Sequence, residues 1–84
     1  MPLITMFYGI IITMYWNDHL PPHFHAKFGE YKALFDLDGN IIKGEFPSNQ
    51  RKLVEAWVVL HKEELAADWE LARESVPVLP IDPL

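Results

Sequence analysis

In the first half of the chain, apolar and polar positions alternate with the period of two that is typical of β-strands. Gly9 marks a bulge or bend, and Pro21–Pro22 interrupt strand pairing because proline has no N–H to donate. The pattern predicts an antiparallel meander sheet of three to four strands between about residues 3 and 46. The segments rich in β-branched and aromatic residues are 3–7, 10–16, 23–28, 31–37 and 41–46.

The register of one hairpin can be derived from its turn. A two-residue turn at Gly29–Glu30 sets Phe24 opposite Phe35. The same register sets His23 opposite Asp36. The polar side chains of this hairpin, including both of its histidines, then share the outer face. The other face forms the expected core, which comprises Phe24, Ala26, Phe28, Tyr31, Ala33, Phe35, Leu37, Ile42 and Phe46.

A second two-residue turn is predicted at Gly39–Asn40. It sets Phe35 opposite Gly44 and Asp36 opposite Lys43. A cation would therefore lie beside the Asp36 carboxylate on the polar face.

The second half of the chain has the three-to-five residue spacing of an amphipathic helix between about residues 48 and 74. Ser48 or Asn49 is the expected N-cap. The pattern fits either one long helix or two helices that meet near His61. The apolar positions that recur at helical spacing are Leu53, Trp57, Leu60, Leu65, Trp69 and Ala72.

The last residues, 76–84, contain three prolines and predict an extended tail. Strands followed by a helix indicate an α+β fold in which the helix covers the apolar sheet face. With only 84 residues, we expect a single domain over residues 1–84 with a small core, which makes a homodimer reasonable.

The net charge of −5 argues against general nucleic-acid binding, because phosphate backbones attract basic surfaces. The chain has no cysteine, which excludes disulfides and thiolate metal sites and is compatible with the cytoplasm, where we expect the protein. The apolar start, residues 1–16, is too short to span a bilayer, so we expect no membrane association.

Three of the four histidines, His19, His23 and His25, lie within seven residues beside two prolines. Histidine binds metals and transfers protons at neutral pH. His23 and His25 share one strand face, and the register adds Asp36 and Glu45 to that face. Two imidazoles with a carboxylate suit Zn, Mn or Fe, and His19 would be a third ligand if the proline turn folds it back.

The same residues have two other interpretations. His23 or His25 could act as a general base oriented by Asp36, with Arg51 or Lys52 in the first helical turn holding an anionic group. Alternatively, histidine and aspartate could form a structural polar pair on a solvated sheet.

Two further residues beside the histidines are candidate binding residues. Asp18 can close an Asx-type turn before the prolines. Tyr15 is expected close to the histidines, on the strand face opposite Met14 and Trp16.

Several motifs along the whole chain resemble the small bacterial family named domain of unknown function 4160. They are Phe7-Tyr8-Gly9-Ile10, Asp18-His19-x-Pro21-Pro22-His23-Phe24-His25-Ala26, Gly29-Glu30-Tyr31, Trp57-x-x-x-His61-x-x-Glu64-Leu65-x-x-x-Trp69 and Ile81-x-Pro83-Leu84. The resemblance implies a cytoplasmic protein of a two-gene, toxin–antitoxin-like module, with a protein partner encoded by the neighbouring gene. It implies no activity.

Two functions follow as hypotheses. The first is a protein-binding module of such a two-gene system. The second is a small hydrolase or nuclease-like enzyme that uses the histidine cluster, with or without a divalent metal. Whether the protein is an enzyme stays open at this point.

Overall fold

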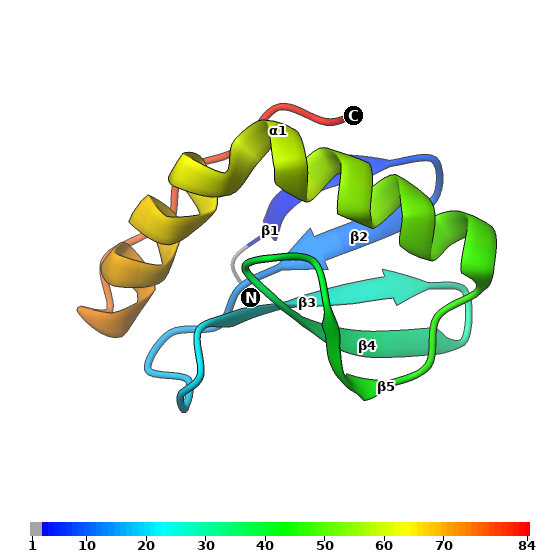
Figure 1. Ribbon diagram of the computed structural model, residues 1–84. Coiled ribbons are helices and arrows are strands. Elements are labelled where there is room, and N and C mark those ends of the chain that lie inside the picture. The colour runs from blue at the N-terminus through cyan, green and yellow to red at the C-terminus, as the bar shows by residue number, and fades with distance from the viewer. Residues whose placement is uncertain (1–2) are drawn as a thin grey trace.

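The computed structural model describes residues 3–84, which form one antiparallel sheet and one helix. Within these residues the sheet has five strands, arranged in chain order, instead of the predicted three to four. Figure 1 shows the helix lying across one face of the sheet, which confirms the α+β class. The elements are β1 (Leu3–Phe7), β2 (Ile10–Thr13), β3 (His23–Phe28), β4 (Tyr31–Asp36), β5 (Ile41–Gly44) and α1 (Ser48–Arg73).

A tight turn between β1 and β2 explains why the sheet has more strands than predicted. Tyr8 and Gly9 have positive φ angles of 48° and 78°, as a two-residue hairpin turn requires. Phe7 therefore pairs with Ile10, and β1 folds back on β2. Tyrosine rarely adopts a left-handed conformation, so the sequence indicated only a bulge or bend at Gly9.

The predicted register of β3 and β4 is confirmed. Phe24 lies opposite Phe35, and His23 lies opposite Asp36. The two phenylalanine rings stack with centroids 5.5 Å apart and planes 5° from parallel. The turn at residues 29–30 is thus sufficient to align this hairpin.

The predicted register of β4 and β5 is wrong, by two residues at Lys43 and Gly44. Lys43 lies opposite Leu34 instead of Asp36, and Ile41 lies opposite Phe35. The ladder is irregular between Leu34 and Phe35. Lys43 is thereby moved away from the Asp36 carboxylate that was expected to neutralise it.

The side chain of Asp36 explains this shift. Its Oδ1 accepts hydrogen bonds from the backbone N–H groups of Asp38 and Asn40, each at 2.9 Å. The amide group of Asn40 also donates to Oδ2 at 3.2 Å. These bonds close a loop longer than two residues, in which Gly39 has a φ of 91°.

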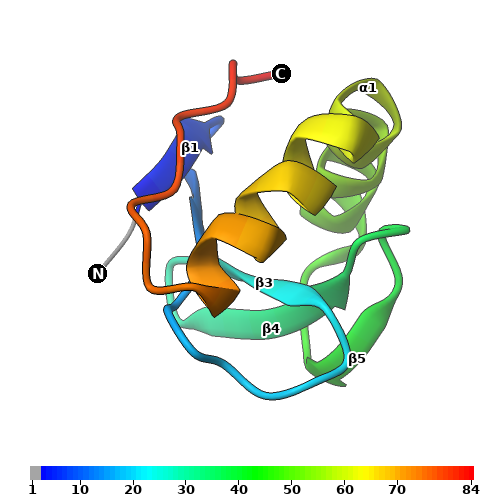
Figure 2. The same ribbon diagram turned by 90° about the vertical axis from the view of Figure 1, so that its left-hand side faces the viewer.

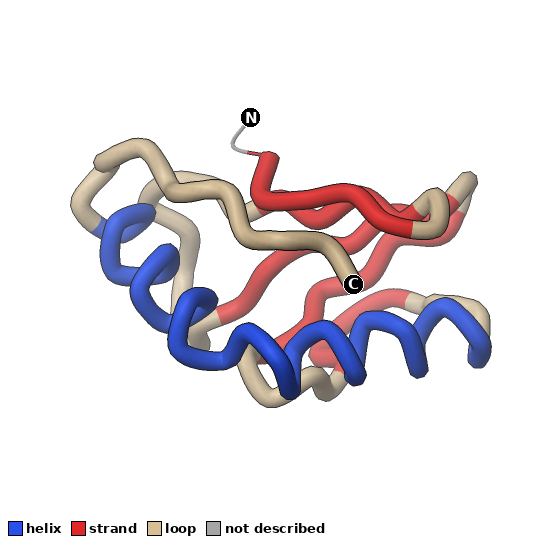
Figure 3. Tube along the Cα trace, turned by 90° about the horizontal axis from the view of Figure 1, so that it is seen from above, coloured by secondary structure: helices blue, strands red, loops and turns tan. Residues whose placement is uncertain are grey.

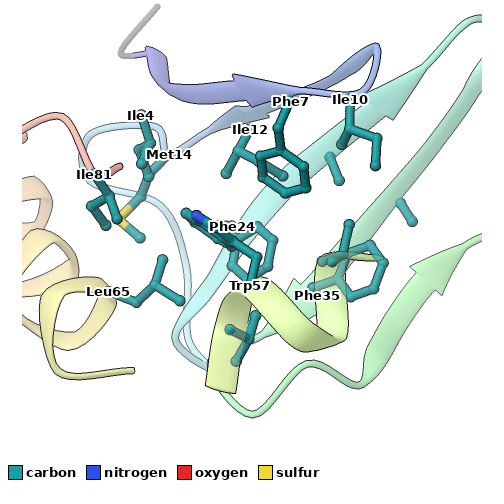
Figure 4. Close-up of a cluster of buried hydrophobic side chains, with 14 of the residues drawn as sticks. Ile4, Phe7, Ile10, Ile12, Met14, Phe24, Phe35, Trp57, Leu65 and Ile81 are labelled. Atoms are coloured by element: carbon teal, nitrogen blue, oxygen red, sulfur yellow. The ribbon is translucent and has the colours of Figure 1, made fainter. Parts of the chain in front are cut away.

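The core lies between the sheet and α1 (Figure 4), and Trp57 is at its centre. The Trp57 ring is 5.6 Å from the ring of Phe7 and 5.7 Å from that of Phe24. Tyr31 and Ile42, both predicted core residues, are 47% and 44% exposed. Ile42 is exposed because, in the shifted register, Ile41 is the residue that lies opposite the buried Phe35.

Helix α1 begins at Ser48 after Pro47 and has no side-chain cap, so the predicted cap by Ser48 or Asn49 is wrong. It is one element with a bend at His61, where φ is −129° and ψ is 27°. Nδ1 of His61 lies 2.7 Å from Oε1 of Glu64. Beyond this bend, the second half of the helix reaches the start of β3, where the ring of Trp69 lies 5.4 Å from that of His23.

The extended tail was predicted correctly, and it packs against β1 (Figures 2 and 3). The N–H of Ile81 donates to the carbonyl of Ile4 at 3.2 Å. The indole N–H of Trp57 donates to the carbonyl of Asp82 at 2.8 Å. Ile81 is only 4% exposed and belongs to the core, so the tail is a structural part of the domain.

Asp68 is a buried carboxylate on α1. It is 2% exposed, and Oδ1 accepts the N–H of Leu79 at 3.0 Å. Oδ2 has no hydrogen-bond partner among residues 3–84. Burial raises the pKa of Asp68, the Leu79 N–H offsets part of this effect, and the nearby charge of Glu64 adds to it.

Helix α1 lacks an apolar stretch of the length needed to cross a bilayer, and it is the one helix among the described residues.

Candidate functional site

The connection between β2 and β3, residues 14–22, carries the first part of the histidine motif. The N–H of Asn17 donates to the carbonyl of Ala72 at 3.1 Å, and its side-chain amide donates to Oγ of Ser75 at 2.7 Å. These two bonds attach the connection to the end of α1, and Asp18 lies beside the first residues of β3. The Leu20–Pro21 peptide bond within the connection is cis.

His23 is buried, with an exposed fraction of 2%. The prediction that it lies on a solvent-exposed face is therefore wrong. Its ring lies 5.4 Å from that of Trp69, on the part of α1 that follows the bend. Nδ1 lies 2.7 Å from the carbonyl oxygen of Pro21, and Nε2 lies 2.9 Å from Oδ2 of Asp18. Both ring nitrogens of this buried histidine thus face oxygen atoms.

His25 shares the strand face of His23 and reaches the same carboxylate. Its Nε2 lies 3.1 Å from Oδ2 of Asp18. Its side chain is 32% exposed, and its ring meets that of Tyr15 edge-on with centroids 4.4 Å apart. His25 is therefore the accessible member of the group.

One nitrogen of each histidine and one oxygen of Asp18 lie within 4.8 Å of one another. We refer to Asp18, His23 and His25 as the Asp18 cluster. Partial burial raises the pKa of Asp18, but contacts with His25, the His19 N–H and His23 outweigh it and hold the pKa below its usual value. Asp18 is therefore an ionised carboxylate at neutral pH.

Two residues expected at the centre of the site lie beside the cluster. The His19 side chain is 76% exposed, and its Nδ1 lies 3.3 Å from Oδ1 of Asp18, the oxygen that the other two histidines do not use. Asp36 is paired with His23 in the ladder, but its carboxylate points to its own loop. The residue that joins His23 and His25 is therefore Asp18, whereas Asp36 was the predicted carboxylate and His19 the predicted third ligand.

The expected cations of the first helical turn, Arg51 and Lys52, are not brought to the cluster. Arg51 borders a small hollow with Tyr31 and Phe46, at the end of the sheet where β3 finishes. Its Nε lies 3.8 Å from Oε1 of Glu55. The cluster instead lies at the start of β3.

Asp18 was predicted as a candidate binding residue that closes a turn, but its role as the carboxylate shared by His23 and His25 was not predicted. The motif contained a signal for it, because a proline pair between Asp18 and His23 can reverse the chain and return it over a short distance. The structure of the connection, including its attachment to α1, was needed to select this residue.

The fold and the cluster define a small α+β domain with a two-histidine, one-carboxylate site at the start of β3, the central strand of its helix-covered sheet. A family model described as a domain of unknown function (DUF4160) matches residues 9–70, which is well over half of the chain. The chain therefore belongs to this family. The searches found no matching curated protein and no matching solved structure.

Proposed function

We propose that the protein binds a divalent transition-metal ion through the Asp18 cluster and that this ion supports hydrolytic chemistry. The observation that carries the proposal is the convergence of Nε2 of His23 and Nε2 of His25 on Oδ2 of Asp18, at 2.9 and 3.1 Å. Two imidazoles and one carboxylate form a ligand set that suits Zn, Mn or Fe(II).

The distances within the cluster support this proposal. Two ligand atoms bound about 2.1 Å from one ion at right angles are separated by about 3 Å. The separations between each histidine nitrogen and Asp18 Oδ2 have this size. An ion could therefore enter between these atoms with small side-chain movements.

The orientation of His23 supports the proposal independently. A carbonyl oxygen only accepts hydrogen bonds, so the Nδ1–H group of His23 donates a hydrogen bond to the carbonyl oxygen of Pro21. In a neutral ring, the lone pair of Nε2 then points at the Asp18 carboxylate. Such a contact is favourable only with a cation or a proton between the two atoms. A backbone carbonyl that fixes the second ring nitrogen is also the usual support of a metal-bound histidine.

Three protein ligands leave coordination positions for water or substrate. An ion with open positions lowers the pKa of bound water and polarises a bound ester or phosphoryl oxygen. His25 lies on the accessible side of the cluster, so these positions would face Tyr15 and the solvent. The reaction class we propose is therefore metal-assisted hydrolysis.

Isothermal titration calorimetry on chelator-treated protein, with Zn²⁺ and Mn²⁺ added separately, tests the proposal. We expect one ion per chain, and we expect Asp18→Asn and His25→Gln to weaken its binding by about 100-fold or more. Circular dichroism establishes that both variants are folded. His61→Gln is the matched control, because it removes a histidine that lies outside the cluster.

Two results would contradict the proposal. One is the absence of binding at millimolar metal concentrations. The other is equal weakening by His61→Gln, which would mean that the ion binds elsewhere. If metal is not bound, acid–base catalysis by His25 with Asp18 as its partner becomes the alternative chemistry.

A protein-binding module is the second candidate function. Val59 and Leu60, next to the bend of α1, are 77% and 66% exposed, and adjacent exposed apolar side chains favour a contact surface. The family resemblance suggests a bacterial cytoplasmic protein and a partner encoded by the neighbouring gene. Co-purification of the two gene products, compared with a Val59→Ser/Leu60→Ser variant, tests this candidate.

A further inference from the structure

A concave surface on the sheet adjoins the Asp18 cluster. Its cavity has a volume of about 530 Å³, which lies in the range of small-molecule sites. Ile11 and Leu34 contribute apolar side chains to its lining, and Tyr15 and His25 line it as well. Because His25 also belongs to the Asp18 cluster, the cavity and the cluster are continuous.

Three lysines, Lys27, Lys32 and Lys43, line this cavity. They are three of the seven basic residues in a chain whose net charge is −5. Lys27 and Lys32 lie directly opposite each other in the β3–β4 ladder. A directly opposed pair of like charges destabilises a sheet, so folding alone does not account for this arrangement.

The register shift of β5 strengthens the positive charge of this surface. In the predicted register, Lys43 would lie opposite Asp36. In the structure it lies opposite Leu34, which places it diagonal to Lys32. The Asp36 carboxylate is engaged by Asn40 and its own loop. Among residues 3–84, none of the three lysines forms an ion pair.

We propose that this cavity binds a small organic phosphate, with the phosphate between Lys27, Lys32 and Lys43 and the organic part against Ile11 and Leu34. Charge complementarity supports a phosphate dianion, since it would relieve the repulsion between the lysines. The cavity is a second site beside the proposed metal centre, and anion binding by the lysines does not require the ion.

A small ligand fits these observations better than a nucleic acid does. Nucleic-acid strands are held by basic surfaces that follow many phosphates, and their affinity grows with the number of phosphates neutralised. Here only three lysines gather, at one cavity, on a protein with an acidic net charge. Arg51, Lys62 and Arg73 lie elsewhere, each beside a carboxylate.

Phenyl phosphate is the probe for this proposal, and it is titrated into metal-free protein while amide resonances are followed by nuclear magnetic resonance. We expect shifts at Ile11, Lys27, Lys32, Leu34 and Lys43. The Lys27→Gln/Lys32→Gln variant should bind phenyl phosphate at least about tenfold more weakly. Lys62→Gln is the single-charge control, because Lys62 lies on α1 and pairs with Asp38.

Each outcome has a defined meaning. Changes in the amide resonances of the cavity residues that are lost in the double variant support the proposal. Binding of phenyl phosphate that is retained in Asp18→Asn separates this site from the metal centre. The absence of binding at 10 mM, a millimolar limit typical of weak ligands, would overturn it, and so would equal weakening by Lys62→Gln. Tighter binding of a single-stranded oligonucleotide than of phenyl phosphate would overturn it in favour of a nucleic-acid surface.

Discussion

Nε2 of the buried His23 lies 2.9 Å from Oδ2 of the partly exposed Asp18. This contact joins the first residue of β3 to the connection that precedes it, and it orders both the start of this central strand and the candidate metal site. The stability of the domain and the geometry of the site are therefore coupled at one carboxylate.

Asp18→Asn in metal-free protein is expected to reduce stability at pH 7 by about 1 kcal/mol, because the negative charge beside His25 and the His19 N–H is lost. The folded-state pKa of Asp18 is lowered, so its contribution is present above the ordinary value of 3.8 and is lost as pH falls through the lower folded value. Urea unfolding between pH 2.5 and 7 measures this. A difference in unfolding free energy between the two proteins that is as large at pH 2.5 as at pH 7 would contradict the prediction. Glu70→Gln is the control, because Glu70 is an exposed carboxylate outside the cluster.

Asp68 should have the opposite pH dependence. Its folded-state pKa is raised above 3.8, so its burial increasingly destabilises the fold as pH rises from 3.8 through the folded value. Asp68→Asn retains an acceptor for the Leu79 N–H and removes the buried charge. We expect this variant to gain about 1 kcal/mol at pH 7 and nothing at pH 3. Thermal unfolding at both pH values tests this, and an equal gain at both would contradict it.

Asp36 is expected to act as a loop residue and not as part of the site. Asp36→Ala removes the acceptor for the N–H groups of Asp38 and Asn40 and should cost about 1–2 kcal/mol. Asp36→Asn keeps one acceptor oxygen and should cost less. Neither change should alter metal binding in the calorimetric experiment, and a loss of metal binding in folded Asp36→Asn would return Asp36 to the site.

Gly44 lies next to Lys43, and its lack of a side chain is required. Its φ angle is 90°, and an added Cβ would clash with the carbonyl oxygen of Lys32 and lie 3.0 Å from Cα of Ala33. Gly44→Ala should therefore destabilise the protein by about 2–3 kcal/mol. Gly29→Ala is the matched control, since φ there is 58° and no atom lies within 4 Å of the added Cβ. Equal losses for the two variants, measured by chemical denaturation, would contradict the clash.

The fold was predictable where local patterns were sufficient. The turn at Gly29–Glu30 determined the β3–β4 register, because only one alignment places Phe24 and Phe35 on the same apolar face. The helix followed from the apolar spacing, which left open whether it is one helix or two that meet near His61. The structure has one element with a bend at this residue. The β4–β5 register could not be derived in this way, because the side chain of Asp36 competes with the backbone for the hydrogen bonds of the loop.

The sequence by itself determined the type of the elements, the family and the group of histidines from which a site could be built. Only the tertiary structure decided that Asp18 joins His23 and His25 and that the His19 side chain lies outside this group. It also decided that Lys43 joins the opposed pair Lys27 and Lys32. The physical reason is that periodicity encodes which face a side chain occupies. The meeting of residues in different elements depends instead on how the connection is attached to α1 and on where the helix bends.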